Sequence, residues 1–339
     1  MRRTVLRDAW KIAATYIGTV VGAGFASGQE VLQFFTKLGP FAVLTIAASA
    51  LLFYVLGERV MFIGRKTGAQ SFGLVASTRF GARIGRWMQV VMLIMLFGVT
   101  VTMVAGSGAL MFEQWHIPIA AGSLFTVLLT GAVLFFGLRG VMSANSIIVP
   151  IMIGFIILVF LSRLTPHYEL SLVNPAVTPL QAILSALSYA GFNVGLSVTV
   201  LIPLGHEAID RFTLRLGAFM GALALGVMLL LIHLLLVNAF FAPDGVQIPM
   251  GYVAAHLPVL VRLVFIVTLW AEIFSTLVAN IYGMAHEMAR ENRRLYVGAI
   301  ALILAATYFG SQIGFGTMVS YAYPIFGYIG AIMLIAVLT

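Results

Sequence analysis

Long apolar runs separated by short polar gaps form the main pattern of this chain. A helix needs about 20 apolar residues to cross the hydrocarbon core of a bilayer. The runs therefore predict an all-α integral membrane protein, a single transmembrane domain over 1–339, with ten spanning helices. We place them at 10–36, 39–63, 85–112, 118–138, 143–162, 180–204, 212–241, 257–286, 294–311 and 313–338.

The composition supports this prediction. Of the 339 residues, 61% are hydrophobic and only 9% are charged, whereas soluble chains carry about 25% charged residues. The sequence contains no cysteine, so disulfides are excluded. The basic N-terminus leads into an apolar run that continues beyond the roughly 7–15 residues of a signal-peptide core. We interpret this run as a permanent first span.

The basic residues indicate the orientation of the spans. With the N-terminus in the cytoplasm, 16 of the 19 Lys and Arg residues lie on the cytoplasmic side, and only Lys37, Arg163 and Arg262 lie outside. This is the bias that the positive-inside rule describes. The net charge of +8 is thus a topology signal, and no nucleic-acid partner is expected.

Two connections between spans have patterns of their own. In 64–84, basic residues alternate with apolar ones, which predicts a helix lying along the inner membrane surface. Residues 242–257 form an almost uncharged outer loop, which we interpret as a lid over an entry path.

Glycine is concentrated in the middle of the first span. Gly18, Gly22, Gly24 and Gly28 occur there together with Ser27, and each helical glycine costs about 1 kcal/mol relative to alanine. We predict that the helix is broken here. Unwound backbone at this depth is tolerated only inside protein or beside a polar cavity, and it exposes carbonyls and amides that can bind ions and solutes.

A similar pattern recurs in the sixth span. Ala23-Gly24-Phe25-x-x-Gly28 is matched by Ala190-Gly191-Phe192-x-x-Gly195. The second copy lies five spans after the first, so their orientations are opposite. The pattern predicts two inverted five-helix repeats, 10–162 and 180–338, with breaks in helices 1 and 6. The alternative is that these glycines serve only the close packing of membrane helices.

This arrangement resembles the LeuT-type fold of the amino acid–polyamine–organocation superfamily. Within it, the stretch Val-Gly-Ala-Gly-Phe-Ala-Ser-Gly-Gln-Glu at 21–30 closely resembles YkvI-like bacterial membrane proteins. The resemblance implies a multi-pass protein of the bacterial cytoplasmic (inner) membrane. It also implies a secondary active transporter of a small solute, an amino acid or related compound, coupled to Na⁺ or H⁺ by alternating access around the broken helices.

The resemblance also implies site residues. Sodium is expected at the carbonyls of Gly18 and Val21 and the hydroxyls of Ser275 and Thr276. The expected substrate contacts are the broken backbone of span 1, whose amides would hold a carboxylate or similar group, and the middle of span 6, namely Gly22, Ala23, Gly24, Phe25, Ala26, Ser27, Gly191, Phe192 and Asn193.

Two acidic residues leave alternatives open. Glu272 stands one turn before the hydroxyl pair, where the family usually has a small residue. A carboxyl at this depth is costly unless it is paired, coordinates a cation or stays protonated. Proton carriage, cation coupling and a structural hydrogen-bond role are all possible for it. Glu30 is either an outer-gate residue or a solvated charge at a helix end.

Other function classes have weaker support. A non-transporting solute sensor or accessory protein is the main alternative. A membrane-embedded enzyme is not expected, because the sequence shows neither a metal-spaced His/Asp cluster nor a nucleophile with a nearby base. No cofactor is expected apart from Na⁺ as a coupling ion. A highly anionic substrate is not expected either, because no lysine or arginine lies near mid-membrane.

Overall fold

The computed structural model describes residues 2–69, 71–136, 141–162, 177–208, 210–238, 246–289 and 293–338, and every regular element in these ranges is helical. Seven helices in the described part of the chain are long and apolar enough to cross a membrane, and two shorter apolar helices lie at 119–135 and 148–161. The chain is therefore an all-α, multi-pass membrane protein, as the sequence predicts.

The helices match the predicted spans. Span 1 is divided into α1 (Arg2–Val20), α2 (Ala23–Ala26) and α3 (Gln29–Phe34), and a 3₁₀ segment, η1 (Thr36–Phe41), leads into span 2. Spans 2 to 9 are α4 (Ala42–Thr67), α6 (Ala82–Trp115), α7 (Ile119–Phe136), α8 (Val141–Ser162), α9 (Pro179–Glu207), α10 (Arg211–Asn238), α12 (Val259–Ala289) and α13 (Arg293–Ser311). Span 10 comprises α14 (Phe315–Thr317), the π-helical turn η2 (Met318–Ala322) and α15 (Tyr323–Leu338).

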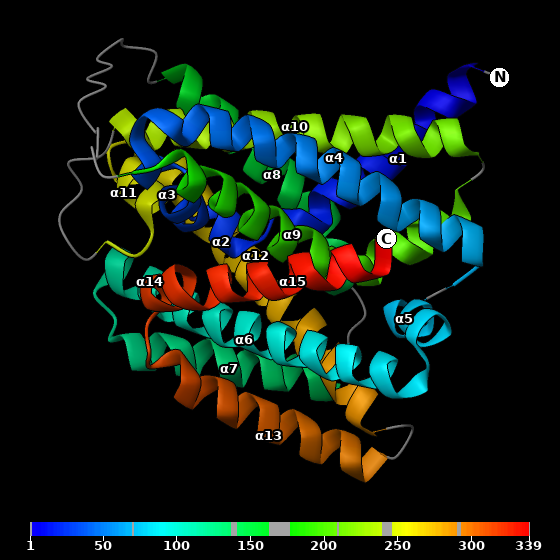
Figure 1. Ribbon diagram of the computed structural model, residues 1–339. Helices are drawn as coiled ribbons and strands as arrows, with labels where there is room; N and C mark the ends of the chain where they lie inside the picture. The colour runs from blue at the N-terminus through cyan, green and yellow to red at the C-terminus, as the bar shows by residue number, and fades with distance from the viewer. Residues whose placement is uncertain are drawn as a thin grey trace.

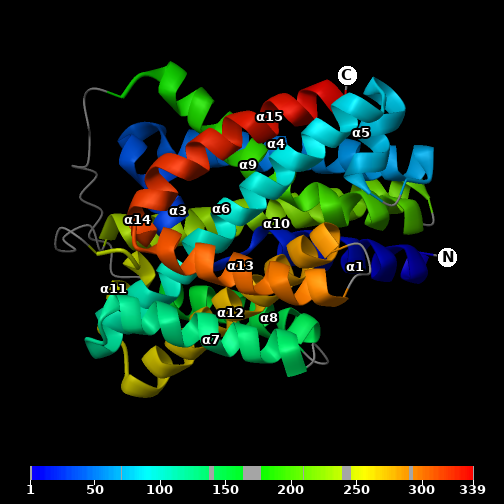
Figure 2. The same cartoon turned by 90° about the horizontal axis from the view of Figure 1, so that it is seen from below.

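The long helices run lengthwise through the molecule and define two ends. The start of α1, the end of α15 and the short helix α5 (Phe72–Phe80) lie toward one end, which we call the α5 end (Figure 1). The short helix α11 (Pro249–Ala255) lies with α3 and α14 toward the other, the α11 end. Figure 2 shows the same separation from a second side.

The helix contacts made by the first five spans resemble those made by the last five. Helix α1 packs against α10, and the corresponding helix of the second half, α9, packs against α4. Likewise α6 packs against α7, and α12 packs against α13. Such matched contacts are expected if two five-helix units interlock. The repeat boundaries at 10–162 and 180–338 stay a prediction.

The predicted surface helix and lid both correspond to short helices. Helix α5 begins after Ser71, whose hydroxyl accepts a hydrogen bond from the Leu74 amide at 3.2 Å. It buries Phe72 and Val75 while Leu74 stays exposed, the two-sided pattern of a surface helix. Residues 239–245 lie outside the described part of the chain, but α11 forms the second half of the predicted lid and is mostly buried.

The break in span 1 is confirmed. Helix α1 ends at Val20, and Gly22 is extended (φ −128°, ψ −175°) before α2 begins. A second interruption follows at Ser27-Gly28, where Gly28 has a φ of 79°, a left-handed conformation that glycine adopts without steric cost. The Ser27 hydroxyl donates to the Gly24 carbonyl at 3.0 Å and so stabilises this turn.

The predicted break in span 6 is wrong. Helix α9 is continuous through 191–195. A Cβ at Gly191 would collide with the main chain of Gly327 in α15, and one at Gly195 would approach Gly330. These glycines let α9 and α15 approach closely. In span 6 the glycines therefore serve helix packing, the alternative to a break.

Candidate substrate cavity

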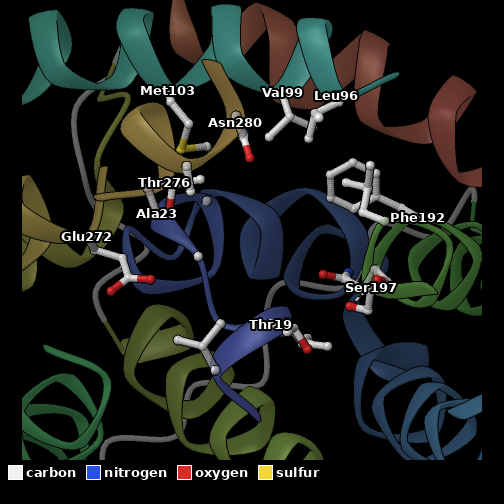
Figure 3. Close-up of a pocket in the computed structure, with 18 of the residues that line it drawn as sticks. Thr19, Ala23, Leu96, Val99, Met103, Phe192, Ser197, Glu272, Thr276 and Asn280 are labelled. Carbon is white, nitrogen blue, oxygen red and sulfur yellow. Dashed lines mark hydrogen bonds between the residues drawn. The ribbon is translucent and has the colours of Figure 1, made fainter. Parts of the chain in front are cut away.

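A cavity of about 280 Å³ lies beside the break in span 1. Its walls come from the α1–α2 junction, the beginning of α3, α6, α9, α12 and the beginning of α15. Figure 3 shows side chains from several of these helices converging on it. The lining residues are Gly18, Thr19, Val20, Val21, Gly22, Ala23, Gly24, Glu30, Leu96, Val99, Met103, Phe192, Asn193, Leu196, Ser197, Thr199, Val200, Glu272, Thr276, Ala279, Asn280 and Tyr323.

The cavity opens toward the α5 end. Thr199 and Val200, in the half of α9 that leads to Glu207, line the cavity and are exposed. Ala279, in the corresponding half of α12, is also exposed. The exposed part of the cavity lining therefore lies toward the end at which α9 packs on α5.

Contacts close the opposite, α11 end. The Met250 amide of α11 donates to the Ser27 carbonyl at 2.9 Å, so α11 is bonded directly to the broken helix. The Ser185 hydroxyl donates to the Phe34 carbonyl at 2.6 Å, which ties α9 to α3. The Tyr189 ring packs against Phe34, with ring centroids 5.1 Å apart.

Glu30 lies at the closed side of the cavity. It is 4% exposed, and its Oε2 accepts a hydrogen bond from the Tyr189 hydroxyl at 3.2 Å. Its carboxyl lies so close to the α2 backbone that a Cβ at Gly24 would collide with it. The interpretation of Glu30 as a solvated end charge is therefore wrong. The outer-gate role stays a prediction.

Glu272 is the second buried carboxyl of the cavity. It is 1% exposed, and its Oε2 has no hydrogen-bond partner among the described residues. Figure 3 shows Glu272 and Thr276 extending from α12 toward the α1–α2 junction, where Ala23 lies. An unpartnered buried carboxylate oxygen is costly, so this arrangement is typical of a site that receives a cation or a proton.

The predicted sodium ligands are only partly brought together. Gly18, Val21 and Thr276 line the cavity. The last carbonyls of a helix lack amide partners within that helix, and those of α1 lie at this junction. Ser275 is buried outside the lining, and its hydroxyl donates to the main-chain oxygen of Glu272 at 3.1 Å. Sodium binding stays a prediction.

The predicted substrate residues divide in the same way. Gly22, Ala23, Gly24, Phe192 and Asn193 line the cavity, and the Phe192 ring packs against Tyr323 with centroids 4.2 Å apart. The others are buried outside the lining, namely Phe25, Ala26, Ser27 and Gly191. Their roles in binding also stay predictions.

Sequence reasoning missed several wall residues. Leu96, Val99 and Met103 of α6 face the cavity, and their spacing of three and four residues is the signal of a single helix face. Tyr189 directly precedes the Ala-Gly-Phe pattern of span 6, but nothing in the sequence indicates that its hydroxyl reaches Glu30.

Comparison with known proteins gives close and distant relatives. The chain is 34% identical over 328 residues to the membrane protein YkvI of Bacillus subtilis (strain 168), covering 95% of this chain and 93% of that protein. It is 23% identical over 337 residues to YyaD of the same organism, covering 98% and 96%. No family model matches the sequence.

Solved structures share the fold at low sequence identity. MhsT in complex with L-phenylalanine matches with a TM-score of 0.68 and 15% identity, covering 95% of this chain and 87% of that one. A substrate-bound, outward-open Na⁺-coupled sialic acid symporter matches at 0.61 and 14%, covering 96% and 77%. The Eremococcus coleocola manganese transporter matches at 0.53 and 14%, covering 99% and 86%. The fold is thus of the LeuT type.

Proposed function

We propose that this chain, which belongs to the family of the membrane protein YkvI, is a secondary active transporter of a small solute in the bacterial cytoplasmic membrane. The observation that carries the proposal is the cavity beside the broken helix, whose lining is exposed toward the α5 end and buried and hydrogen-bonded toward the α11 end. Alternating access requires a central site of this kind, exposed to one side at a time.

The bias of basic residues supports an assignment of the two ends to the two sides of the membrane. Arg65 and Lys66 end α4, and Arg79 ends α5, at the end toward which the cavity opens. With the positive-inside rule, the α5 end is cytoplasmic and the conformation is inward-open. The N-terminus is then cytoplasmic, and α11 closes the outer path.

For the coupling ion, Na⁺ and H⁺ both fit the cavity wall. Thr276 and the carbonyls of Gly18 and Val21 offer hard oxygen ligands to Na⁺, and the carboxyl of Glu272 can pair with a cation or carry a proton. One structural neighbour is a Na⁺-coupled symporter.

The test is uptake into proteoliposomes under an imposed Na⁺ or H⁺ gradient, across a panel of amino acids and amines. We expect accumulation of at least one solute with one of the two gradients. Thr276→Ala should abolish Na⁺-dependent thermal stabilisation, because it removes a cavity oxygen. Glu272→Gln should abolish uptake driven by a proton gradient.

Thr307→Ala is a matched control, because Thr307 is buried in α13 and its hydroxyl donates to its own helix at Leu304. It should leave uptake unchanged. Solute binding without uptake under either gradient would instead indicate the sensor or accessory function. If no solute is accumulated or bound, the transporter proposal fails.

A further inference from the structure

The place expected for a substrate carboxylate is filled by the protein itself. The resemblance to the LeuT-type fold implies that the backbone around Ala23 and Gly24 holds a substrate carboxylate or similar group. In the structure, the carboxyl of Glu30 lies directly against Gly24, and Tyr189 holds it there through a 3.2 Å hydrogen bond. A solute with its own carboxylate would have to displace the Glu30 carboxyl from this place. Otherwise the two negatively charged carboxylates would lie side by side.

The rest of the cavity is also acidic. Glu272 contributes a second carboxyl, nine-tenths or more buried, whose Oε2 has no partner among the described residues. Among the lining residues that the structure describes, none is lysine, arginine or histidine. Two carboxyls without a cationic partner disfavour an anionic group and favour a positive one.

An aromatic wall completes the surroundings. The rings of Phe192 and Tyr323 pack together with centroids 4.2 Å apart, and both residues line the same cavity as Glu30. A carboxylate combined with aromatic faces is a common environment for ammonium groups, because the ring faces attract cations. The cavity volume of about 280 Å³ suits a small ligand.

We propose that the solute is a small organic cation, an amine without a free carboxylate, whose ammonium group binds between Glu30 and the aromatic wall of Phe192 and Tyr323. This inference rests on the proposed transport function and names its substrate class. The Glu30 carboxyl then pairs with the solute, and Glu272 remains for a coupling cation or proton.

The experiment compares solutes that differ only in the carboxylate. Phenethylamine is paired with phenylalanine, and putrescine with ornithine, in thermal unfolding of the purified full-length protein and in proteoliposome uptake. We expect at least one amine to raise the unfolding midpoint by about 3 °C or more at saturating concentration. The matching amino acid should bind at least about tenfold more weakly, since its carboxylate would lie near two carboxyls that have no cationic partner in the cavity lining.

Variants test the role of Glu30. Glu30→Gln should weaken amine binding by at least about thirtyfold, the usual effect of removing one partner of a buried charge pair. Glu287→Gln is the control, because Glu287 is exposed, lies outside the cavity lining and accepts a hydrogen bond from Gln89. If Glu30→Gln does not fold, Tyr189→Phe keeps the carboxyl and removes one hydrogen bond. It should weaken amine binding about fivefold.

Several results would overturn the inference. Equal binding and uptake of phenylalanine and phenethylamine would do so while leaving the transporter function intact. Amine binding that is unchanged in Glu30→Gln would do so as well. Stabilisation by MnCl₂ alone, lost in Glu30→Gln, would show that the acidic cavity is a metal site. If neither amines nor amino acids bind or are taken up, the proposed function fails and the inference fails with it.

Discussion

Residues 23–28 and residues 190–195 carry the same Ala-Gly-Phe-x-x-Gly pattern, yet the first lies in an interrupted helix and the second in a continuous one. Within both copies the Ala-Gly-Phe part is itself helical. The interruptions in span 1 lie on either side of it, at Gly22 and at Ser27-Gly28.

The residues that flank this part differ between the two copies. The second copy has Tyr189 where the first has Gly22, and Val194 where the first has Ser27. Tyrosine and valine leave the α9 backbone helical, whereas Gly22 is extended and the Ser27 hydroxyl stabilises a turn. A repeated motif can thus mark related positions without giving them the same backbone conformation.

The two regions also differ in what their glycines contact. Gly191 lies against the Gly327 main chain of α15, whereas Gly24 lies against the carboxyl of Glu30. The first contact is between two rigid helices, and the second involves a side chain that can move. Substitutions at these glycines should therefore differ in their effects on the free energy of unfolding and on solute uptake.

The largest effect is expected at Gly191. A methyl group in Gly191→Ala meets the main chain of Gly327 and the Ala331 side chain, so the free energy of unfolding should fall by about 2–3 kcal/mol, toward the upper end for overpacking. Thermal unfolding in detergent measures this loss. The control is Gly154→Ala in α8, where the Cβ meets nothing within 4 Å. If Gly191→Ala is as stable as the control, the packing account of α9 is incorrect.

An intermediate effect is expected at Gly28. Its φ of 79° is unfavourable for residues with a Cβ, and the new methyl group would also approach Met250. Gly28→Ala should cost about 1–2 kcal/mol, and Gly28→Asn should cost less in backbone strain because asparagine adopts left-handed conformations more readily. The variant for comparison is Gly195→Ala, which changes the equivalent glycine of the second copy, where the α9 backbone is helical. Equal midpoints for Gly28→Ala and the unmodified protein would argue against a strained turn.

The smallest effect on stability is expected at Gly24, together with a clear effect on transport. Gly24→Ala displaces the flexible Glu30 carboxyl, so the unfolding free energy should change by less than about 1 kcal/mol. Solute uptake should fall at least about tenfold, because a small displacement of a positioning group has large kinetic effects. Normal uptake in this variant would mean that the position of Glu30 against α2 does not matter for transport.

The helical spans could be predicted because bilayer thickness imposes a length on every apolar run. The interruption of span 1 could be predicted because Gly22, Gly24 and Gly28 accumulate at one depth. The continuity of α9 could not, because it depends on Gly327 and Gly330, which follow more than 130 residues later. Helix propensity describes a single helix and contains no information about the surface that packs against it.

The site was predictable to a similar degree. Glu272 and Thr276 stand out because polar residues are rare in apolar spans, and both line the cavity. Glu30 was ambiguous, since its distance from the centre of the span suggested solvent. Its burial follows from the second interruption at Gly28, which turns α3 so that the carboxyl reaches Gly24. Only the three-dimensional course of the backbone gives this result.

The hydrogen bond from the Met250 amide to the Ser27 carbonyl joins the outer helix α11 to the broken span. In the proposed alternating-access cycle, opening of the α11 end by movement of α11 would break this bond. An intramolecular hydrogen bond contributes about 1 kcal/mol net, which changes the ratio of two conformers about fivefold. In the proposed transport cycle, this single main-chain contact would bias the populations of the two conformers toward the one in which the α11 end is closed.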